Sequence, residues 1–485
     1  MKKIYHYIKK KKDWYSKVRI RAHLDLIKSR KVACYIIKHE NVIKHKFYPF
    51  LNFTIKTFKL QKRLEREIQC LDKSEAYKLR EINYSCHSDA YIFSYYNSLL
   101  IEKYEDFLTN NKLDNIIAYR SIKKKDSKGN IKGKSNIDFA AEAFLEIEKR
   151  KECYCLGIDI TKFFNNIGHD YLYNNLSKIL KVEKLDKDWY QIYKVLTDFH
   201  FIKLDKFLKN EHINLTKKEL LGKNNIKKIC SAKLFRKILK DNRDLIERNP
   251  KISSKKGIPQ GTNISGTFAN IYMLDFDLRL KKHIERIDGY YRRYSDDILV
   301  ITNTFDQLEK IIKIIQEELS IIGLEISNEK TICCKFQDNK CKSISCSLKE
   351  ESNKDNLLQY LGFTYDGMNI RVRNNTIGRF WVEALSHTKN IILDNAKRNK
   401  RIPIAKIYGL YTHLNNRNKK AEYLGNFYGY IRKAHNTFKD NCNGCYGFGS
   451  KVKIKDQMNN SWDILHKYMK KICQKYNISS ELIDI

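Results

Sequence analysis

The sequence predicts an α+β protein that is mostly helical and contains at least one β-hairpin. Two apolar and β-branched runs, 289–293 and 298–302, flank the tetrapeptide Tyr-Ser-Asp-Asp at 294–297, a pattern typical of two strands joined by a tight turn. Between residues 87 and 108 apolar side chains return every three or four positions, which indicates an amphipathic helix. From about residue 376 to the end the pattern is again helical, and it is rich in basic residues.

Composition limits the class of protein. The chain has 485 residues, of which 42% are hydrophobic, enough for about two to four domains with a large core. Lys and Arg number 94 against 56 Asp and Glu, a formal net charge of +38, and this excess favours a polyanionic partner, with nucleic acid first. A genomic base-composition bias explains part of the lysine count but not the imbalance of sign.

The 13 cysteines, with no signal peptide and no apolar run long enough to span a membrane, predict reduced thiols in a cytoplasmic protein. Cys442-Asn-Gly-Cys445 has the spacing of half a zinc site. No second ligand pair of matching spacing follows, so zinc binding is left open.

Residues 1–86 are expected to form a basic helical region. Residues 1–63 hold 19 Lys or Arg against 3 Asp or Glu, interleaved with aromatic side chains. That pattern suits phosphate contacts and base stacking, and it suits a solvated helix face equally well. The lysine-rich loop 123–134 suits a lid over phosphates, with a disordered surface loop as the competing interpretation. A helix capped by Ser135 or Asn136 is expected after it, as far as about Lys151.

Asp159 follows a short buried strand, 154–158, and Phe163 and Phe164 come soon after it. A carboxylate beside apolar neighbours is unfavourable unless it meets a cation, so metal coordination is the simplest explanation. A helical, lysine-rich stretch is expected to follow from about 171 to 248.

A glycine-rich loop at 255–266 contains Pro259-Gln260-Gly261. Its glycines permit close backbone approach, and Gln260 offers both a donor and an acceptor to a substrate. The elements expected after this loop are a helix at 267–280, the hairpin, a helix at 305–322, a strand at 324–327 with Lys330 just beyond, and a second hairpin at 360–367.

Four motifs occur in order across residues 155–363: an Asp followed by Phe-Phe, then Pro-Gln-Gly, Tyr-x-Asp-Asp and Leu-Gly-Phe. This order resembles the reverse transcriptases. The resemblance implies a right-hand polymerase with fingers, a palm built on an antiparallel sheet, and a helical thumb. Applied to this chain, it places the fingers at 87–152, the palm at 153–374 with a helical insertion at 171–254, and a basic helical thumb at 375–485.

A narrower resemblance, to bacterial defence-associated and abortive-infection reverse transcriptases, implies a role in antiviral defence. It is carried by segments 85–92, 133–140 and 270–277. The segment 262–266, Thr-Asn-Ile-Ser-Gly, departs from the Ser-Pro-Leu-Ser-Pro usual in intron and retron enzymes. No endonuclease-like Cys/His cluster or ribonuclease H carboxylate set is recognised after the palm, so a retron or mobile-element enzyme is the less favoured alternative.

The resemblance also implies a nucleotidyltransferase that uses two Mg²⁺ ions, or Mn²⁺, to join a 3′-hydroxyl to a deoxynucleoside triphosphate. Asp159 and Asp296, which lie 137 residues apart, are expected to bridge the ions, with Asp297 as the third ligand. Lys330 is the candidate general acid for pyrophosphate.

Seven residues are expected to contact substrate. Phe164 matches the position beneath the sugar that excludes a 2′-hydroxyl, whereas Phe163 suits the core. The backbone from Ile160 to Phe164 is expected to hold the triphosphate, and Tyr294 to pack near the primer terminus. The full set is Arg120, Ile160, Phe163, Phe164, Gln260, Gly261 and Tyr294.

The expected reaction is RNA-directed DNA polymerisation, with an RNA template or non-coding RNA, a DNA product and deoxynucleoside triphosphates as partners. Untemplated or protein-primed synthesis by the same site stays open, as does a homo-oligomer. The alternative from another class is a nucleic-acid-binding scaffold with an inactive site.

Overall fold

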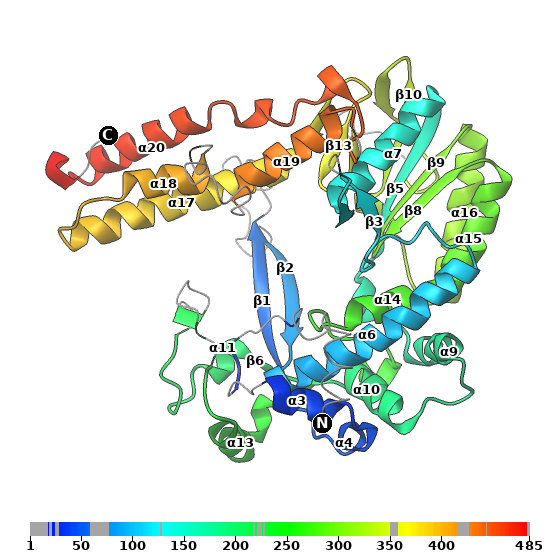
Figure 1. Ribbon diagram of the computed structural model, residues 1–485, viewed down its shortest axis with the longest axis horizontal. Coiled ribbons are helices and arrows are strands. Elements are labelled where there is room, and N and C mark those ends of the chain that lie inside the picture. Colours follow the sequence, from blue (N-terminus) through cyan, green and yellow to red (C-terminus); the bar gives the residue numbers. More distant parts are fainter. Residues whose placement is uncertain are drawn as a thin grey trace.

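The computed structural model describes residues 18, 22–24, 29–58, 77–126, 129–216, 219–220, 226, 228–349, 357–412, 414, 426–442 and 444–482. Most of the basic segment 1–28 therefore lies outside the described residues. Figure 1 shows a sheet-containing body, a helical arm that projects from it, and a long hairpin of two strands standing between them.

A five-stranded antiparallel sheet carries the predicted Tyr-Ser-Asp-Asp hairpin. Its strand order is β11-β10-β5-β9-β8. Both faces are buried, because alternate residues of the central strands enter two different cores: Leu156 and Val300 on one side, Cys155 and Leu299 on the other. The strands are β5 (Cys153–Asp159), β8 (Tyr290–Tyr294), β9 (Asp297–Thr302), β10 (Ile332–Gln337) and β11 (Lys340–Ser343).

Helices cover the two faces of this sheet. On one face lie α15 (Leu274–Arg286) and α16 (Phe305–Ile321), and the latter starts at a capping box in which the Thr304 hydroxyl accepts from the Gln307 amide. On the other face lie α7 (Asn136–Arg150) and α19 (Phe427–Lys439), whose apolar residues share the second core. The sheet edge that holds the hairpin is thereby fixed between two packed layers.

The helices predicted at 87–108, after Ser135 and at 305–322 are confirmed as α6 (His87–Asn110), α7 and α16. The predicted helix at 267–280 is two helices, α14 (Ser265–Tyr272) and α15, divided at Met273. The loop 123–134 contains a small hairpin of β3 (Lys123–Lys125) and β4 (Ile131–Gly133).

The prediction that region 1–86 is helical is wrong in part. It contains α3 (Ser29–Ile36) and α4 (His39–Ile43), but also β1 (Phe50–Phe58) and β2 (Tyr77–Tyr84), which pair antiparallel. Apolar and polar residues alternate along much of 50–58, which favours a strand with one buried face.

The helical insertion predicted at 171–254 likewise contains strands. β6 (His200–Lys203) and β7 (Glu247–Arg248) join the hairpin in a second sheet of order β2-β1-β6-β7. The segment of β6 is a strand because it pairs with β1, about 150 residues away, and no local sequence pattern predicts it. The helices around it are α9 (His169–Leu180), α10 (Lys187–Thr197), α11 (Leu204–Phe207) and α13 (Ala232–Asp241).

The strand predicted at 324–327 is absent from the described segment 228–349. Only Ile326 forms a bridge, to Ile160, because the chain here runs beside the loop after β5, where two backbone bonds hold it. These bonds join the Thr161 amide to the Glu325 carbonyl (2.9 Å) and the Ser327 amide to the Asp159 carbonyl (2.8 Å). The segment therefore presents Lys330 beside Asp159.

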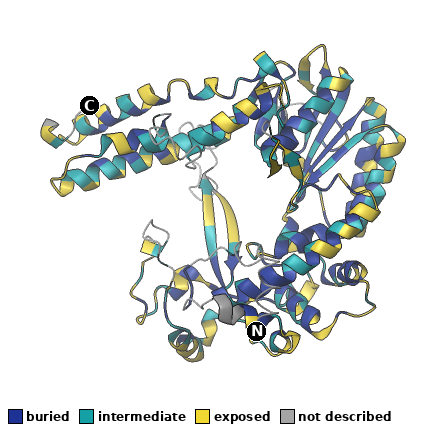
Figure 2. Cartoon of the chain, viewed as in Figure 1, coloured by how far each residue is buried: buried dark blue, intermediate teal, exposed yellow. Residues whose placement is uncertain are grey.

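The C-terminal part is helical, as predicted, after a small three-stranded sheet. The arm of Figure 1 consists of α17 (Asn374–Lys397), α18 (Ile404–Tyr411) and α20 (Ser461–Lys475). Figure 2 shows that the arm helices are largely intermediate or exposed, whereas the central strands β5 and β9 of the five-stranded sheet are mostly buried. The small sheet contains β12 (Leu358–Tyr360), β13 (Phe363–Tyr365) and β14 (Ile370–Val372).

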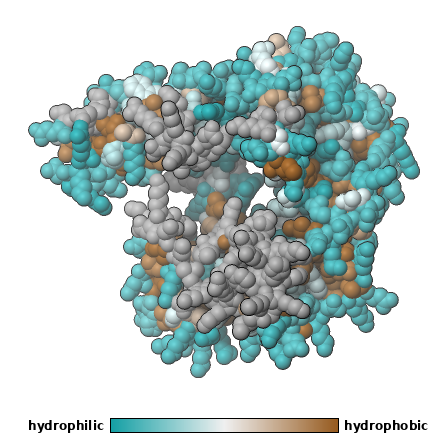
Figure 3. All heavy atoms as spheres, viewed as in Figure 1, coloured by the Kyte–Doolittle hydropathy of each residue, from teal (hydrophilic) through white to brown (hydrophobic). Residues whose placement is uncertain are grey.

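Hydrophilic side chains dominate the described surface seen in Figure 3, and apolar side chains form only scattered patches on that face. Among the described helices, none combines the length and the apolar character that crossing a bilayer requires.

Candidate active site

The three predicted aspartates lie at one end of the five-stranded sheet. Asp159 ends β5 and stands opposite Asp297, the first residue of β9, in the antiparallel register. Asp296 precedes it in the turn, and its carbonyl accepts from the Ile160 amide at 3.2 Å. Ser295, the first residue of the two-residue turn, has a positive φ of 61°, as such tight hairpins require. The fold thus brings together carboxylates that are far apart in sequence.

The carboxylates disfavour one another's ionisation. Burial, together with the negative charge of Asp159, raises the pKa of Asp296. Asp297 keeps contact with solvent, yet the protein packed around it removes part of its hydration. That desolvation, with the charges of Asp296 and Asp159, raises the pKa of Asp297 to about 7. Further positive charge, such as that of a bound cation, would offset this repulsion.

Lys330 supplies one positive charge. It ends the short 3-10 helix Asn328–Lys330, and its ammonium forms an ion pair with the Asp159 carboxylate. The Lys330 side chain is half exposed, so it is free to leave the carboxylate when another cation or a substrate arrives.

Divalent cations suit these ligands chemically. Within the described ranges, no three His, Cys, Asp or Glu side chains already converge closely enough to hold an ion. The donors here are hard carboxylate oxygens, the ligand type preferred by Mg²⁺ and Mn²⁺. The raised pKa of Asp296 and Asp297 comes from burial and then from the neighbouring carboxylates, and a bound cation would act against both. The residues therefore fit the predicted metal in their chemistry, and Asp159 is paired with Lys330.

A pocket of about 360 Å³ contains Gln260 and Gly261. The Gln260 carbonyl accepts from the Asn83 amide of β2 at 2.8 Å. Gly261 has φ +123°, and a Cβ there would lie 2.7 Å from the Ile82 side chain and 2.8 Å from the Asn83 carbonyl. Only glycine fits this contact between loop and strand. The lining residues are Ile82, Tyr84, Ser85, Ala90, Tyr119, Phe164, Gln260, Gly261, Thr262, Asn263, Ser265 and Gly266.

Phe163 and Phe164 point in different directions. Phe163 is 3% exposed in the core, whereas Phe164 lines the pocket. This placement agrees with the expectation that only Phe164 is available to a substrate, and its role at the sugar stays a prediction.

Tyr119 is a pocket residue that the sequence analysis did not assign. Its φ of +58° is unusual for a bulky residue, and its side chain is 49% exposed. The ring lies over Gly266, where a Cβ would be 2.7 Å from it, and the hydroxyl is 3.3 Å from the Ser295 hydroxyl. Tyr119 thus forms an aromatic wall between the pocket and the turn that carries Asp296. No local sequence signal marks it, because its position depends on Gly266.

Lys78 and Arg80 of β2 also belong to the site and were missed. Lys78 is exposed, yet partial loss of hydration and the neighbouring cations Arg80 and Lys330 lower its pKa, while Asp159 and Asp296 act to raise it, so these five charges share one neighbourhood. Lys78, Arg80 and Ile82 alternate along the strand and therefore occupy one face of it. Because the β1–β2 hairpin was not predicted, Lys78 and Arg80 could not be assigned to the site.

Two of the predicted substrate residues already have partners within the chain. The guanidinium of Arg120 is engaged by Glu105, at 2.9 and 2.7 Å, and by the Ile116 carbonyl at 2.6 Å, so Arg120 braces its own segment instead of offering a free cation to a triphosphate. The amide of Ile160 is bonded to the turn at Asp296 and is equally unavailable. Tyr294 is half-buried at the end of β8, with its ring centroid 6.4 Å from that of Phe139.

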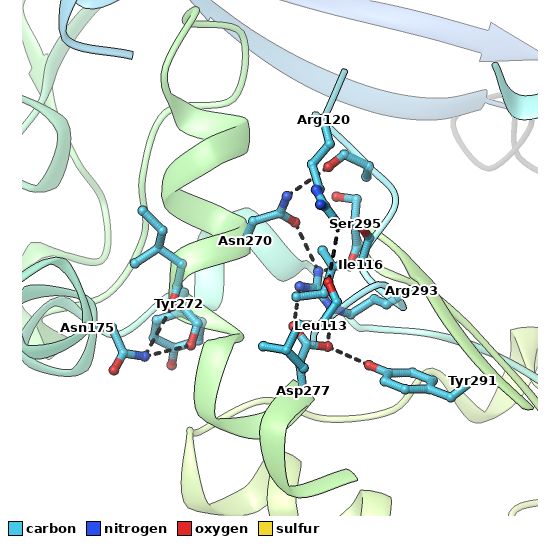
Figure 4. A network of polar contacts seen from close by, with 12 residues as sticks. Leu113, Ile116, Arg120, Asn175, Asn270, Tyr272, Asp277, Tyr291, Arg293 and Ser295 are labelled. Carbon is cyan, nitrogen blue, oxygen red and sulfur yellow. Dashed lines mark hydrogen bonds and ion pairs between the residues drawn. The ribbon is translucent and has the colours of Figure 1, made fainter. Parts of the chain in front are cut away.

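A buried polar network holds the turn from below, and Figure 4 shows it. The Arg293 guanidinium donates to both oxygens of Asp277, at 2.8 and 2.6 Å, to Asn270 at 3.2 Å and to the Ser295 carbonyl at 2.9 Å. Asn270 also donates to the Ala118 carbonyl at 2.8 Å. Helices α14 and α15 thereby position both the turn of Asp296 and the segment of Tyr119.

Comparison with known proteins gives a family and a set of structures. The family described as reverse transcriptase (RNA-dependent DNA polymerase) matches residues 103–365, more than half of the chain. A search of curated proteins found no match.

Two solved structures similar to this chain are telomerases. Apo telomerase from Candida tropicalis, truncated from its C-terminal domain, is 14% identical with a TM-score of 0.38, covering 61% of this chain and 53% of its own. Telomerase from Candida albicans in complex with a TWJ fragment of telomeric RNA is 12% identical with a TM-score of 0.39, covering 92% and 63%. The chain thus spans about half to two thirds of the length of these proteins.

Proposed function

The chain belongs to the reverse transcriptase (RNA-dependent DNA polymerase) family, and from this premise we propose that it polymerises deoxynucleotides on an RNA template. One observation carries the proposal. Asp159 faces Asp297 across β5 and β9, with Asp296 in the adjoining turn, at the end of a sheet that also meets the pocket of Gln260 through Tyr119 and Ser295.

Asp159, Asp296 and Asp297 hold two divalent cations in this proposal. When bound, the cations stabilise the attacking and leaving oxygens of the nucleotidyl transfer. The β5–β9 register and the Arg293 network fix the backbone that carries the carboxylates, and in this proposal Asp159 leaves Lys330 and the three side chains turn toward the cations. The freed ammonium of Lys330 is then available to donate a proton to the departing pyrophosphate.

The incoming nucleotide occupies the pocket of about 360 Å³. Lys78 and Arg80 neutralise its triphosphate, since their charges already act on the aspartates. Phe164 lies against the sugar and excludes a 2′-hydroxyl, and the Gln260 amide contacts the nucleotide or the templating strand.

Nucleic acid is the macromolecular partner, either an RNA template or a non-coding RNA, together with the DNA product. The net charge of +38 supports this, because counterion release from the phosphate backbone favours binding to a strongly basic surface.

The proposal includes a role in bacterial antiviral defence, which the resemblance of segments 85–92, 133–140 and 270–277 suggests, and a cytoplasmic location, which the 13 cysteines suggest. Each of these segments contributes a buried polar group that holds the architecture. Asp89 accepts from His45 and the Tyr48 amide, Asp138 caps α7, and Asp277 pairs with Arg293. These groups hold this fold together, and the proposed defence role rests on the sequence resemblance of the three segments.

The test is primer extension by the purified chain on an RNA template with Mg²⁺ and all four deoxynucleotides. We expect extension that chelation of the metal abolishes and that Asp296→Asn with Asp297→Asn reduces by at least about a thousandfold, since removing a charge stabiliser at the reacting centre costs roughly that much. Asp338→Asn, on the exposed turn after β10, is the matched control.

The products separate the alternatives. DNA covalently attached to the protein would indicate priming by a side chain, and DNA unrelated to the template would indicate untemplated synthesis. If wild type and variant both bind nucleic acid but make no product, the proposal is contradicted and the protein is a nucleic-acid-binding scaffold with an inactive site.

A further inference from the structure

Cys442 and Cys445 form a close pair of thiols in the turn that follows α19. Their sulfur atoms are 3.0 Å apart, and the Cys445 amide donates to the Cys442 carbonyl at 2.9 Å. Cys442 is exposed and Cys445 is half-buried, so small molecules in solution reach the pair.

The zinc site left open by the sequence needs more ligands than this pair provides. Structural zinc takes four protein ligands. Across the described part of the chain, no set of three His, Cys, Asp or Glu side chains is grouped around a possible ion. Two adjacent thiols without further ligands remain competent for another reaction, oxidation to a disulfide.

The turn lies directly on the β3–β4 hairpin. Gly444 has φ +80°, and a Cβ there would lie 2.4 Å from the Lys125 carbonyl, so the two backbones touch. The Lys124 ammonium donates to the Gly444 carbonyl and pairs with Asp138 in the first turn of α7. A movement of the turn would therefore displace β3 as well.

A second contact continues this attachment. The Tyr446 hydroxyl donates to Glu142 of α7 at 3.0 Å, and Lys134, just after β4, pairs with the same carboxylate. The thiol turn thus fastens the C-terminal region to the lysine-rich hairpin and to the start of α7.

We propose that Cys442 and Cys445 are a redox-active dithiol that low-molecular-weight disulfides, such as glutathione disulfide, oxidise, and that the resulting disulfide locks this turn against the β3–β4 hairpin. The closed ring removes conformational freedom from the turn, which is the physical basis of the locking.

The exchange proceeds in two steps. Burial and the adjacent Cys442 sulfur raise the pKa of Cys445 to about 12, which leaves the exposed Cys442 as the attacking sulfur. Cys442 loses its proton and attacks the small disulfide, and one small thiol leaves. Cys445 then loses its proton and attacks the Cys442 sulfur of the mixed disulfide, and a second small thiol leaves. Two electrons and two protons pass to the small disulfide.

The test equilibrates the full-length protein in glutathione buffers from reducing to oxidising, blocks free thiols by alkylation and maps the peptides. We expect one Cys442–Cys445 disulfide per chain, reversed by dithiothreitol. Cys445→Ser should trap a glutathione adduct on Cys442, whereas Cys442→Ser should leave Cys445 unmodified. Cys34→Ser, which removes another exposed thiol, should leave the disulfide intact.

Hydrogen exchange tests whether the disulfide locks the turn against the β3–β4 hairpin. Oxidation should slow amide exchange in the peptide spanning residues 123–133 severalfold in wild type and leave it unchanged in Cys445→Ser. Three results would overturn the proposal: reduced Cys442 and Cys445 in a buffer that already glutathionylates Cys34, unchanged exchange after oxidation, or stoichiometric zinc that is released when the pair is alkylated.

Discussion

Arg293 and Asp277 form a fully buried, bidentate ion pair beneath the turn that carries Asp296. Both side chains have no exposed surface, and the same guanidinium donates to the Ser295 carbonyl at 2.9 Å. Removing one partner leaves an uncompensated buried charge, so Asp277→Asn should lower the free energy of unfolding by about 3–5 kcal/mol. Urea denaturation followed by circular dichroism measures this.

The pair can also be replaced as a whole. The double variant Arg293→Met with Asp277→Leu should recover much of the lost stability, because no charge is then buried. Polymerase activity should stay low, because the Ser295 carbonyl has lost its donor. Full activity in the double variant would show that the pair serves stability alone.

Substitutions of Phe164 and Phe163 should have different effects, the first on nucleotide specificity and the second on stability. Phe164→Ala is expected to admit ribonucleotides and to lower the dATP to ATP ratio of kcat/KM by at least tenfold, since the side chain lines the nucleotide pocket. Phe163→Ala should instead lower the free energy of unfolding by about 3–5 kcal/mol, because it empties a core position. Unchanged discrimination in Phe164→Ala would remove that residue from the sugar site.

Lys78 and Arg80 should bind the triphosphate. Loss of a hydrogen bond between charged groups costs about 1.5–3 kcal/mol, so Lys78→Ala and Arg80→Ala should each lower kcat/KM for deoxynucleotides about tenfold or more. Steady-state kinetics measures this, and Lys56→Ala on the neighbouring strand β1 is the control. Equal effects of the control and of the test variants would point to general charge instead of a specific contact.

Gly261→Ala should disturb the junction between the Pro-Gln-Gly loop and β2. The added Cβ would lie 2.7 Å from Ile82 and 2.8 Å from the Asn83 carbonyl, at a φ that disfavours alanine. We expect a raised KM for deoxynucleotides, because the same strand carries Lys78 and Arg80. Gly133→Ala, where a Cβ meets nothing within 4 Å, should leave KM unchanged.

Local signals predicted a large part of this fold. The helices α6, α7 and α16 and the strands β5, β8 and β9 carry clear periodicity, so their existence could be predicted and only their ends differ. The strand β6 was missed because a short strand is stabilised by its partner, and its partner β1 lies about 150 residues away in the sequence.

The sequence by itself determined the membership in the reverse transcriptase family and predicted the three aspartates as a group. Motif order is a property of the chain, and it does not depend on how the pieces pack. It could not determine which basic residues serve the site. Arg120 was predicted for this role, yet its guanidinium pairs with Glu105, while Lys78 and Arg80, for which we propose the role, lie on a strand that was not predicted.

Only the tertiary structure decided how the aspartates are held. Asp159 lies opposite Asp297 because of the β5–β9 register. The turn that joins β8 to β9 is held by Arg293, whose buried charge is compensated by Asp277 on the helix packed against it. Such pairings form across long stretches of chain, so their energies depend on the folded arrangement and leave no periodic trace in the sequence.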